Sequence, residues 1–181
     1  MSSNAVSLRW MMHMAHTLNN LALAYCNQGK EVEAELLYRR ALSIVERRFG
    51  KDGTETARIK SCLAVVYCDQ GRYREAESLY LKALEIQQMK LGSKDLEVAE
   101  TLNNLASLYS KNNRSAEAEP LFERSINIIE LSLGPYHPEL AEALENYADF
   151  LRENGRKEEE AEAAHHRSTE IWKKAESHKV S

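Results

Sequence analysis

Apolar side chains recur along this chain at spacings of three and four residues, which places them on one side of a helical wheel. The first two stripes consist of Leu18, Leu21, Ala22 and Tyr25, and of Ala34, Tyr38, Ala41 and Ile44. Between the stripes stands Gly29, a residue that readily takes the positive φ angle with which a helix ends. The pattern therefore predicts a pair of amphipathic helices joined by a tight turn.

The same helix pair recurs along the chain with a period of 42 residues. Each repeat begins with an alanine, and a second alanine follows seven residues later in all four. A single helix pair is too small to bury both of its faces, so successive pairs must stack on one another. The sequence thus predicts an all-α protein, an α-solenoid of four helix-turn-helix hairpins. The predicted repeats are residues 15–56, 57–98, 99–140 and 141–174.

Glycine and asparagine mark the predicted turns between helices. Gly29, Gly71 and Gly155 hold the same place in the first, second and fourth repeats, and Asn113 replaces them in the third. Asparagine is among the residues that most readily adopt positive φ in place of glycine. Three further glycines are expected to end the second helices, and these are Gly50, Gly92 and Gly134.

Two helix starts and one helix interior carry further local signals. Asp52 with Glu55 three residues later resembles a capping box that opens the second repeat. Pro138 stands where the start of a helix tolerates proline. Pro120 falls early in a predicted helix, where we expect a slight kink and no break, because its missing N–H lies near the helix start.

The two ends of the chain depart from the repeat. Residues 1–14 carry apolar side chains at helical spacing and no secretory signal, which predicts an N-terminal helical extension. In the fourth repeat one residue is inserted after the turn, and polar His165 replaces the usual aromatic, so we expect a capping helix. Residues 175–181 are expected to fray. Trp10 and Trp172 are expected to cover exposed repeat faces near the two ends; the alternative is that either marks a self-association surface.

Composition and charge narrow the classes of partner. The 181 residues include 24 Lys and Arg against 28 Asp and Glu, a formal net charge of −4. Such a chain has no general attraction for nucleic acid or an anionic membrane, and no apolar run approaches the roughly 20 residues of a membrane span. The three cysteines include no CxxC pair, which suits a reducing compartment, so the predicted location is cytoplasmic.

The small and aromatic residues at fixed places in each hairpin resemble those of the tetratricopeptide repeat. The segments TLNNLALAY from Thr17 and TLNNLASLY from Thr101, with the 42-residue period, resemble the branch found in kinesin light chains and nephrocystin-3. The resemblance covers about residues 15–174. It implies a right-handed superhelix whose concave groove, lined by the first helix of each hairpin, binds peptide segments of partner proteins.

The predicted binding surface is the side of each first helix that lies opposite its core stripe. Asparagine recurs there, and because a side-chain amide both donates and accepts hydrogen bonds, a row of amides can hold any peptide backbone. The resemblance implies cargo contacts for Asn19, Asn20, Asn103, Asn104 and Asn146. An alternative is that these asparagines bond the neighbouring repeat and only orient helices. The remaining predicted groove residues are Leu23, Arg58, Ser61, Val65, Ser107, Lys111, Glu142 and Asp149.

The predicted groove is acidic in the last repeat. Its acidic residues are spaced three, four and four residues apart, and they are Glu142, Glu145, Asp149 and Glu153. This pattern predicts a ligand with basic residues near the last repeat and neutral or aromatic residues near the first two. An alternative is a solvated acidic end that only keeps the molecule soluble.

Candidate catalytic and metal-binding residues lack the further ligands or bases that a metal site or an active site needs. His13 and His16 could touch one metal ion but have no third ligand, and the adjacent His165 and His166 point about 100° apart. His137 is expected in a linker. The cysteines occupy helical positions with no base nearby in the repeat pattern to activate a thiolate. We therefore expect no enzymatic activity, no cofactor and no metal.

The sequence favours a protein-interaction scaffold or adaptor that binds a peptide segment of a partner protein in the groove. The alternative is a structural or assembly module, which self-associates through its N-terminal Leu/Met/Trp face or forms part of a longer array of the same repeats. In either case the expected partner is a protein or peptide, and neither nucleic acid nor a membrane.

Overall fold

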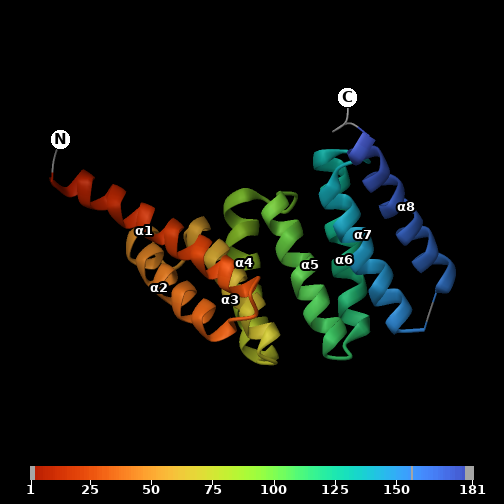
Figure 1. Ribbon diagram of the computed structural model, residues 1–181, viewed down its shortest axis with the longest axis horizontal. Helices are drawn as coiled ribbons and strands as arrows, with labels where there is room; N and C mark the ends of the chain where they lie inside the picture. Colours follow the sequence, from red (N-terminus) through yellow and green to blue (C-terminus); the bar gives the residue numbers. More distant parts are fainter. Residues whose placement is uncertain (1–2, 156, 178–181) are drawn as a thin grey trace. The chain divides into compact units, whose positions relative to one another are not determined.

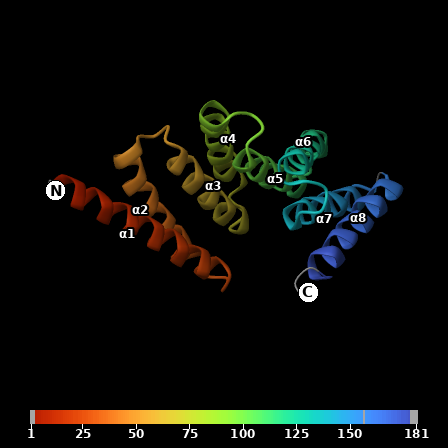
Figure 2. The same cartoon turned by 90° about the horizontal axis from the view of Figure 1, so that it is seen from above.

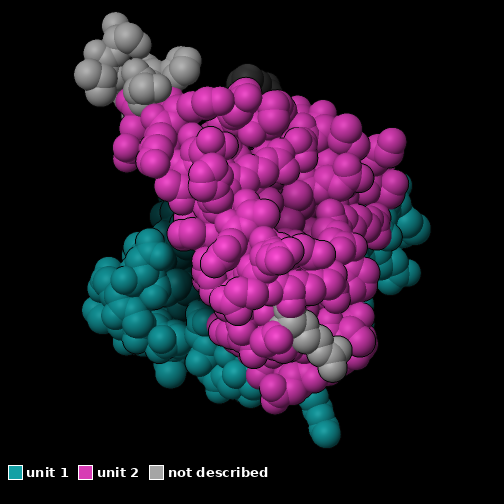
Figure 3. All heavy atoms as spheres, turned by 90° about the vertical axis from the view of Figure 1, so that its right-hand side faces the viewer, with its two compact units in different colours: residues 1–90 teal, residues 91–181 magenta. Residues whose placement is uncertain are grey.

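The computed structural model describes residues 3–155 and 157–177, and every regular element in these ranges is an α-helix. The chain forms two compact units, Met1–Lys90 and Leu91–Ser181, which we call unit 1 and unit 2 (Figure 3). The helices of unit 1 are α1 (Ser3–Cys26), α2 (Glu31–Phe49), α3 (Thr54–Asp69) and α4 (Tyr73–Leu91), of which Leu91 already belongs to unit 2. Those of unit 2 are α5 (Leu96–Lys111), α6 (Ser115–Leu133), α7 (Pro138–Glu153) and α8 (Glu158–Ser177).

Within each unit the helices pack as consecutive antiparallel hairpins (Figures 1 and 2). In unit 1, α1 packs on α2 and α2 on α3, while α3 meets α4 through Ala57, Ala83 and Ile86. In unit 2, α5 packs on α6 and α7 on α8, and α7 also contacts both α5 and α6. The first helices of the two hairpins in unit 2 therefore lie beside each other.

Fully buried alanines allow the close approach of paired helices. The second alanine of each repeat has no exposed surface, and these residues are Ala22, Ala64, Ala106 and Ala148. On the second helices the predicted stripe is buried as well, for example at Ala34 and Tyr38. In the last hairpin, Ala161, Ser168 and Ile171 are buried, whereas His165 is exposed, as expected for a capping helix.

The buried side of α1 is narrower than the sequence predicts. Leu21 belongs to the predicted core stripe but is 44% exposed, whereas its counterparts Leu63 and Leu105 are buried. The helix α3 lies between α2 and α4, whereas α1 packs mainly against α2 and reaches α3 at the contact of 3.7 Å between His16 and Glu55. The prediction that Leu21 is a core residue is therefore wrong.

The predicted turn residues adopt positive φ. Gly29, Gly71 and Gly155 have φ angles of 66°, 72° and 59°, and Asn113 has 57°. The prediction that Asn113 replaces glycine at this turn is confirmed. In the fourth repeat, the longer turn contains a second positive φ angle of 78° at Lys157.

The capping box predicted at Asp52 and Glu55 is wrong. The helix α3 begins at Thr54 with Gly53 as its N-cap, and no side chain caps it. The backbone passes so close to Phe49 that a Cβ atom on Gly53 would lie 2.6 Å from the Phe49 Cβ atom. Only glycine fits at this position, so the chain forgoes a side-chain cap there. The carboxylate of Glu55 instead accepts hydrogen bonds from Arg58.

The two prolines that lie in helices, Pro120 and Pro138, stand where a helix tolerates them. Pro138 is at the N-terminal end of α7, and α6 continues through Pro120 without a break. Residues 175–177 continue α8, whereas the rest of the tail predicted to fray, 178–181, lies outside the described residues, as do the first two residues of the predicted extension.

We predict that Asn113→Ala lowers the free energy of unfolding by about 1 kcal/mol, because alanine lacks asparagine's tolerance of positive φ. Asn113→Gly should change it by less than about 0.5 kcal/mol. Urea denaturation followed by circular dichroism would measure both. The neighbouring Asn112, also exposed but with a φ angle of −100°, provides the control Asn112→Ala. Equal losses for both alanine variants would contradict the strain at Asn113.

Candidate functional site

Two adjoining cavities lie along α5 and α7 in unit 2. The first has a volume of about 430 Å³ and the second about 130 Å³, and Asn146 of α7 lines both. The first cavity is further lined by Leu96, Glu97, Glu100, Asn103, Ile129, Glu139, Glu142 and Ala143. The second is further lined by Ser107, Ser110, Lys111, Phe122, Asp149, Phe150 and Glu153. We call the two together the α5/α7 groove.

The repeat places polar side chains along this groove. The methyl groups of Ala106 and Ala148 face the hairpin cores, so residues on the other side of α5 and α7 remain accessible. Across the second cavity, the Ser110 hydroxyl of α5 donates a hydrogen bond of 3.3 Å to the Glu153 carboxylate of α7. The groove is therefore bordered by both helices and contains amides, hydroxyls and carboxylates.

One amide in the groove has an unsatisfied acceptor. The Oδ1 atom of Asn103 is buried and has no hydrogen-bond partner among the described residues. Asn19, at the same place in the first repeat, also has a buried Oδ1 without a partner in that part of the chain. Leaving a buried acceptor unpaired costs about 1–3 kcal/mol, so a bound donor would be stabilised at such a position.

The predicted groove residues of unit 2 divide between the two cavities. Of the seven predicted there, Asn103, Glu142 and Asn146 line the first cavity. The second is lined by Asn146 with Ser107, Lys111 and Asp149. Asn104 lines neither cavity. The structure thus brings six of these seven predicted residues to one groove.

The predicted residues of unit 1 are buried, exposed or paired at separate places, and none of them lines the unit 1 cavity described below. Asn19 and Ser61 are buried, while Asn20, Leu23 and Val65 are exposed. Arg58 donates hydrogen bonds of 2.8 and 2.9 Å to Glu55, so its charge is compensated within α3. One cavity of unit 1, about 630 Å³, is bordered by α2, α3 and α4, and none of these residues lines it.

The acidic side of α7 is less uniform than predicted. Glu145 accepts a hydrogen bond of 3.0 Å from the Ser168 hydroxyl of α8, and Asp149 forms an ion pair of 2.9 Å with Arg152. Glu142 lines the first cavity and Glu153 the second. The four acidic residues therefore do not form one solvated row, because Glu145 is directed to the neighbouring helix.

The sequence reasoning missed the glutamates in the first turns of α5 and α7. Glu97 and Glu139 line the first cavity and stand 42 residues apart. Glu55 holds the same place in the second repeat. The period itself was therefore the signal that could have found them. Leu96, Ile129 and Ala143 were also missed, since an apolar side chain beside a cavity has the same pattern as one in the core.

Candidate catalytic groups have other roles in the structure. His137 caps α7, since its Nδ1 accepts a hydrogen bond of 3.3 Å from the Glu139 backbone N–H, and His16 lies 3.7 Å from a Glu55 carboxylate oxygen. Burial raises the pKa of the Cys26 thiol, which disfavours its reactive thiolate. Within the described residues no three His, Cys, Asp or Glu side chains are grouped to hold a metal ion.

The chain matches models of a known protein family. A family model described as tetratricopeptide repeat matches residues 55–131 and 97–174, and a second with the same description matches residues 14–55. The chain belongs to the tetratricopeptide repeat family. Domains of this family are generally protein-interaction modules, and their fold is in general a non-enzymatic scaffold. No curated protein matches the chain.

Solved structures show the same fold. BtubC (BKLC) from P. vanneervenii is 26% identical with a TM-score of 0.76, and the match covers 90% of this chain and 64% of that one. The chain thus spans less than two thirds of BtubC. A putative kinesin light chain of Podosopora anserina is 24% identical with a TM-score of 0.70, covering 90% and 76% of the two chains. The predicted all-α helical-hairpin solenoid of the kinesin-light-chain type is confirmed.

One further feature is common to the described helices. None of them is both long and apolar enough to cross a membrane.

The ion pair within α3 predicts a pH-dependent stability. The hydrogen bonds from Arg58 lower the pKa of Glu55 below its ordinary value. A lowered pKa stabilises the fold above the unfolded-state pKa of about 4.3, and this contribution is lost as the pH falls through the folded-state pKa. Arg58→Gln should therefore cost up to about 1 kcal/mol at pH 7 and progressively less below pH 4.

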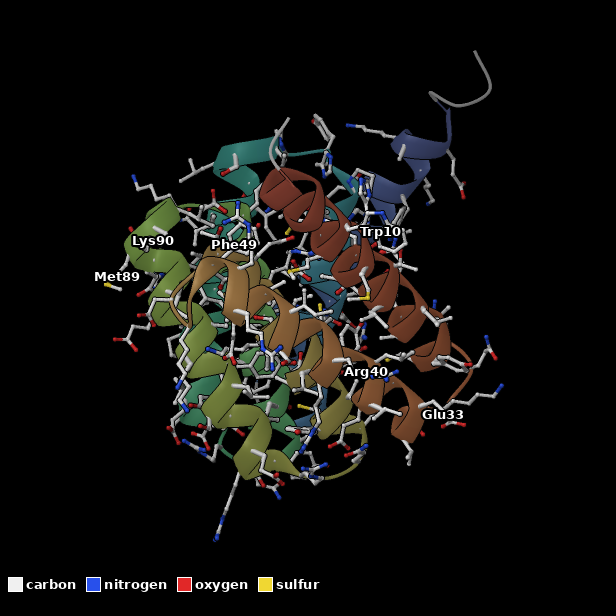
Figure 4. The ribbon with its side chains drawn as sticks, turned by 90° about the vertical axis from the view of Figure 1, so that its left-hand side faces the viewer. Trp10, Glu33, Arg40, Phe49, Met89 and Lys90 are labelled. Atoms are coloured by element: carbon white, nitrogen blue, oxygen red, sulfur yellow. The ribbon has the colours of Figure 1, made fainter. Side chains whose placement is uncertain are left out.

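Urea denaturation at several pH values would measure this difference. The matched control is Arg40→Gln on α2, whose side chain is exposed (Figure 4). A difference between the wild type and Arg58→Gln that stays constant from pH 7 to pH 3 would contradict the role of the pair.

Proposed function

We propose that this chain is a scaffold or adaptor that binds an extended peptide segment of a partner protein in the α5/α7 groove. The observation that carries the proposal is the pair of adjoining cavities, both lined by first-helix residues and joined at Asn146. General membership of an interaction family supports it from an independent direction.

The groove has the chemistry that a peptide backbone requires. The buried Oδ1 of Asn103 lacks a donor among the described residues, and a peptide N–H could supply one. Asn146, accessible between the two cavities, can both donate and accept. Each such hydrogen bond contributes about 0.5–1.5 kcal/mol, so the amides would favour an extended backbone irrespective of its side chains.

The proposal also covers cofactors, catalysis and cellular location. A binding surface of amides and carboxylates needs no cofactor or metal, and the proposal includes no catalytic step. We place the protein in the cytoplasm, where its three free cysteines would remain reduced.

We predict that Asn103→Leu weakens peptide binding about two- to ten-fold, because it removes the acceptor. The same variant should not lower the free energy of unfolding, since the Oδ1 atom has no partner to lose. Fluorescence anisotropy would measure binding of the tightest peptide selected by the wild-type chain from a randomised library of twelve-residue peptides.

The matched control is Asn127→Leu, which replaces an exposed asparagine on α6 outside the groove. It should bind the selected peptide as the wild type does. Equal binding by Asn103→Leu and the wild type would contradict the assigned role of Asn103, and failure to select any peptide would overturn the proposed function.

A second candidate function rests on the apolar surface of α1. Trp10 is 72% exposed and lies on this helix (Figure 4). The expectation that Trp10 covers a repeat face is therefore wrong. Clusters of exposed apolar side chains on a soluble domain often mark interaction sites. From residue 10 onward, the other large apolar residues exposed on this helix are Met11, Met14, Leu21 and Leu23. In this alternative the chain self-associates through α1 or joins further repeats.

Light scattering separates the two candidates. If α1 mediates assembly, the wild type should form a dimer that Trp10→Glu or Met11→Glu converts to a monomer, because a charge cannot be buried unpaired at low cost. Val32→Glu, at a residue exposed on α2, is the control. A wild type that stays monomeric at every concentration would contradict the assembly role.

A further inference from the structure

The first cavity of the α5/α7 groove combines carboxylates with an apolar floor. Four glutamates line it, two from α5 and two from α7, beside the Asn103 amide. The glutamates are Glu97, Glu100, Glu139 and Glu142, and the apolar contacts come from Leu96, Ile129 and Ala143. No lysine, arginine or histidine is among the described residues that line it.

In α3, the positions equivalent to these glutamates carry one negative and one positive charge. There, Glu55 in the first turn is followed three residues later by Arg58, and the two side chains form an ion pair of 2.8 Å. In α5 and α7 the residue at the place of Arg58 is a glutamate, Glu100 or Glu142. The ion pair in α3 thus corresponds to two glutamates one turn apart in both α5 and α7.

A favourable interaction with the helix N-terminus accounts for the positions of only two of these four carboxylates. Glu97 and Glu139 lie in the first turn, where a negative charge interacts favourably with the helix N-terminus. Glu100 and Glu142 lie beyond the first turn, where this benefit has faded, and like charges one turn apart on a helix are unfavourable. Glu139 and Glu142 also form no ion pair with any part of the chain that the structure describes. In α7, where Glu139 and Glu142 lack such a pair, the arrangement is therefore better accounted for by a ligand charge.

We propose that the first cavity receives a lysine or arginine side chain from a basic segment of the partner. This inference rests on the proposed function, which supplies the peptide. The aliphatic stem would pack on Ile129 and Ala143, while the cationic head lies between Glu100 and Glu142. A lysine has three N–H donors and an arginine five, enough to serve these carboxylates and the unpaired Oδ1 of Asn103. A volume of about 430 Å³ falls within the usual range of ligand sites.

The test uses the full chain and a randomised library of twelve-residue peptides. We expect the wild type to enrich lysine or arginine at one position of the selected peptides. The double variant Glu100→Gln/Glu142→Gln should bind the best such peptide about ten-fold more weakly. A control with the same change in net charge is Glu162→Gln/Glu170→Gln on the exposed surface of α8, which should bind as the wild type does.

A single further variant separates loss of binding from loss of folding. Glu142→Arg should form with Glu139 the pair that Arg58 forms with Glu55, so it should bind the basic peptide at least ten-fold more weakly without any loss in the urea midpoint. If no peptide is selected at all, the proposed function fails and this inference with it. If peptides bind but acidic or apolar residues are enriched, or if Glu100→Gln/Glu142→Gln binds as well as the control, peptide binding stands and the basic partner is refuted.

Discussion

Contact between small side chains sets the geometry of each helical hairpin. In all four repeats an alanine with no exposed surface lies on the first helix, and an alanine at most 1% exposed lies on the second. Since methyl groups let two backbones approach closely, the larger residues around them, such as Tyr80 and Phe122, fill the remaining space. An added methylene group at these contacts would displace the helices at a typical cost of about 1–3 kcal/mol. The packing of the larger core residues and the stacking of successive hairpins therefore depend on this distance between paired helices.

The same spacing determines where a ligand can bind. Because the hairpin core occupies one side of each first helix, only the opposite side can carry groups for recognition. In unit 2 two such helices, α5 and α7, lie in contact and share a groove. The groove thus arises from residues that take no part in the hairpin core, so they can change without loss of the fold. The replacement of arginine by glutamate between α3 and the later first helices illustrates this freedom.

The repeat made most of the fold predictable from the sequence. Periodic alanines and glycines identified the helices and their turns, and even Asn113 was assigned its positive φ from its place in the period. The capping box at Asp52 could not be judged in this way, because the close approach of Gly53 to Phe49 depends on the path of the loop. Similarly, the exposure of Leu21 depends on how many helices surround α1, which a stripe on a helical wheel does not reveal.

The candidate site was less predictable than the fold. A helical wheel identifies the accessible side of a helix, and it indicated most of the groove residues on α5 and α7. It does not identify which accessible side chains are bound by a neighbour, as Glu145 is by Ser168 and Arg58 by Glu55. Those contacts depend on rotamers and on the distance to the next helix. They decide which charges remain available to a partner.

The one-sided packing of α1 has a consequence for the energetics of opening. A repeat array is stabilised by contacts between neighbours, so a helix packed mainly on one neighbour, as α1 is on α2, opens at a smaller free-energy cost than one packed on both sides. Local unfolding of unit 1 should therefore begin at α1, and its amide hydrogens should exchange with solvent before those of α3. Opening there would expose the buried faces of Ala15 and Ala22 beside side chains that are already apolar and accessible. The least protected helix of unit 1 is thus also the one most prone to association when it opens.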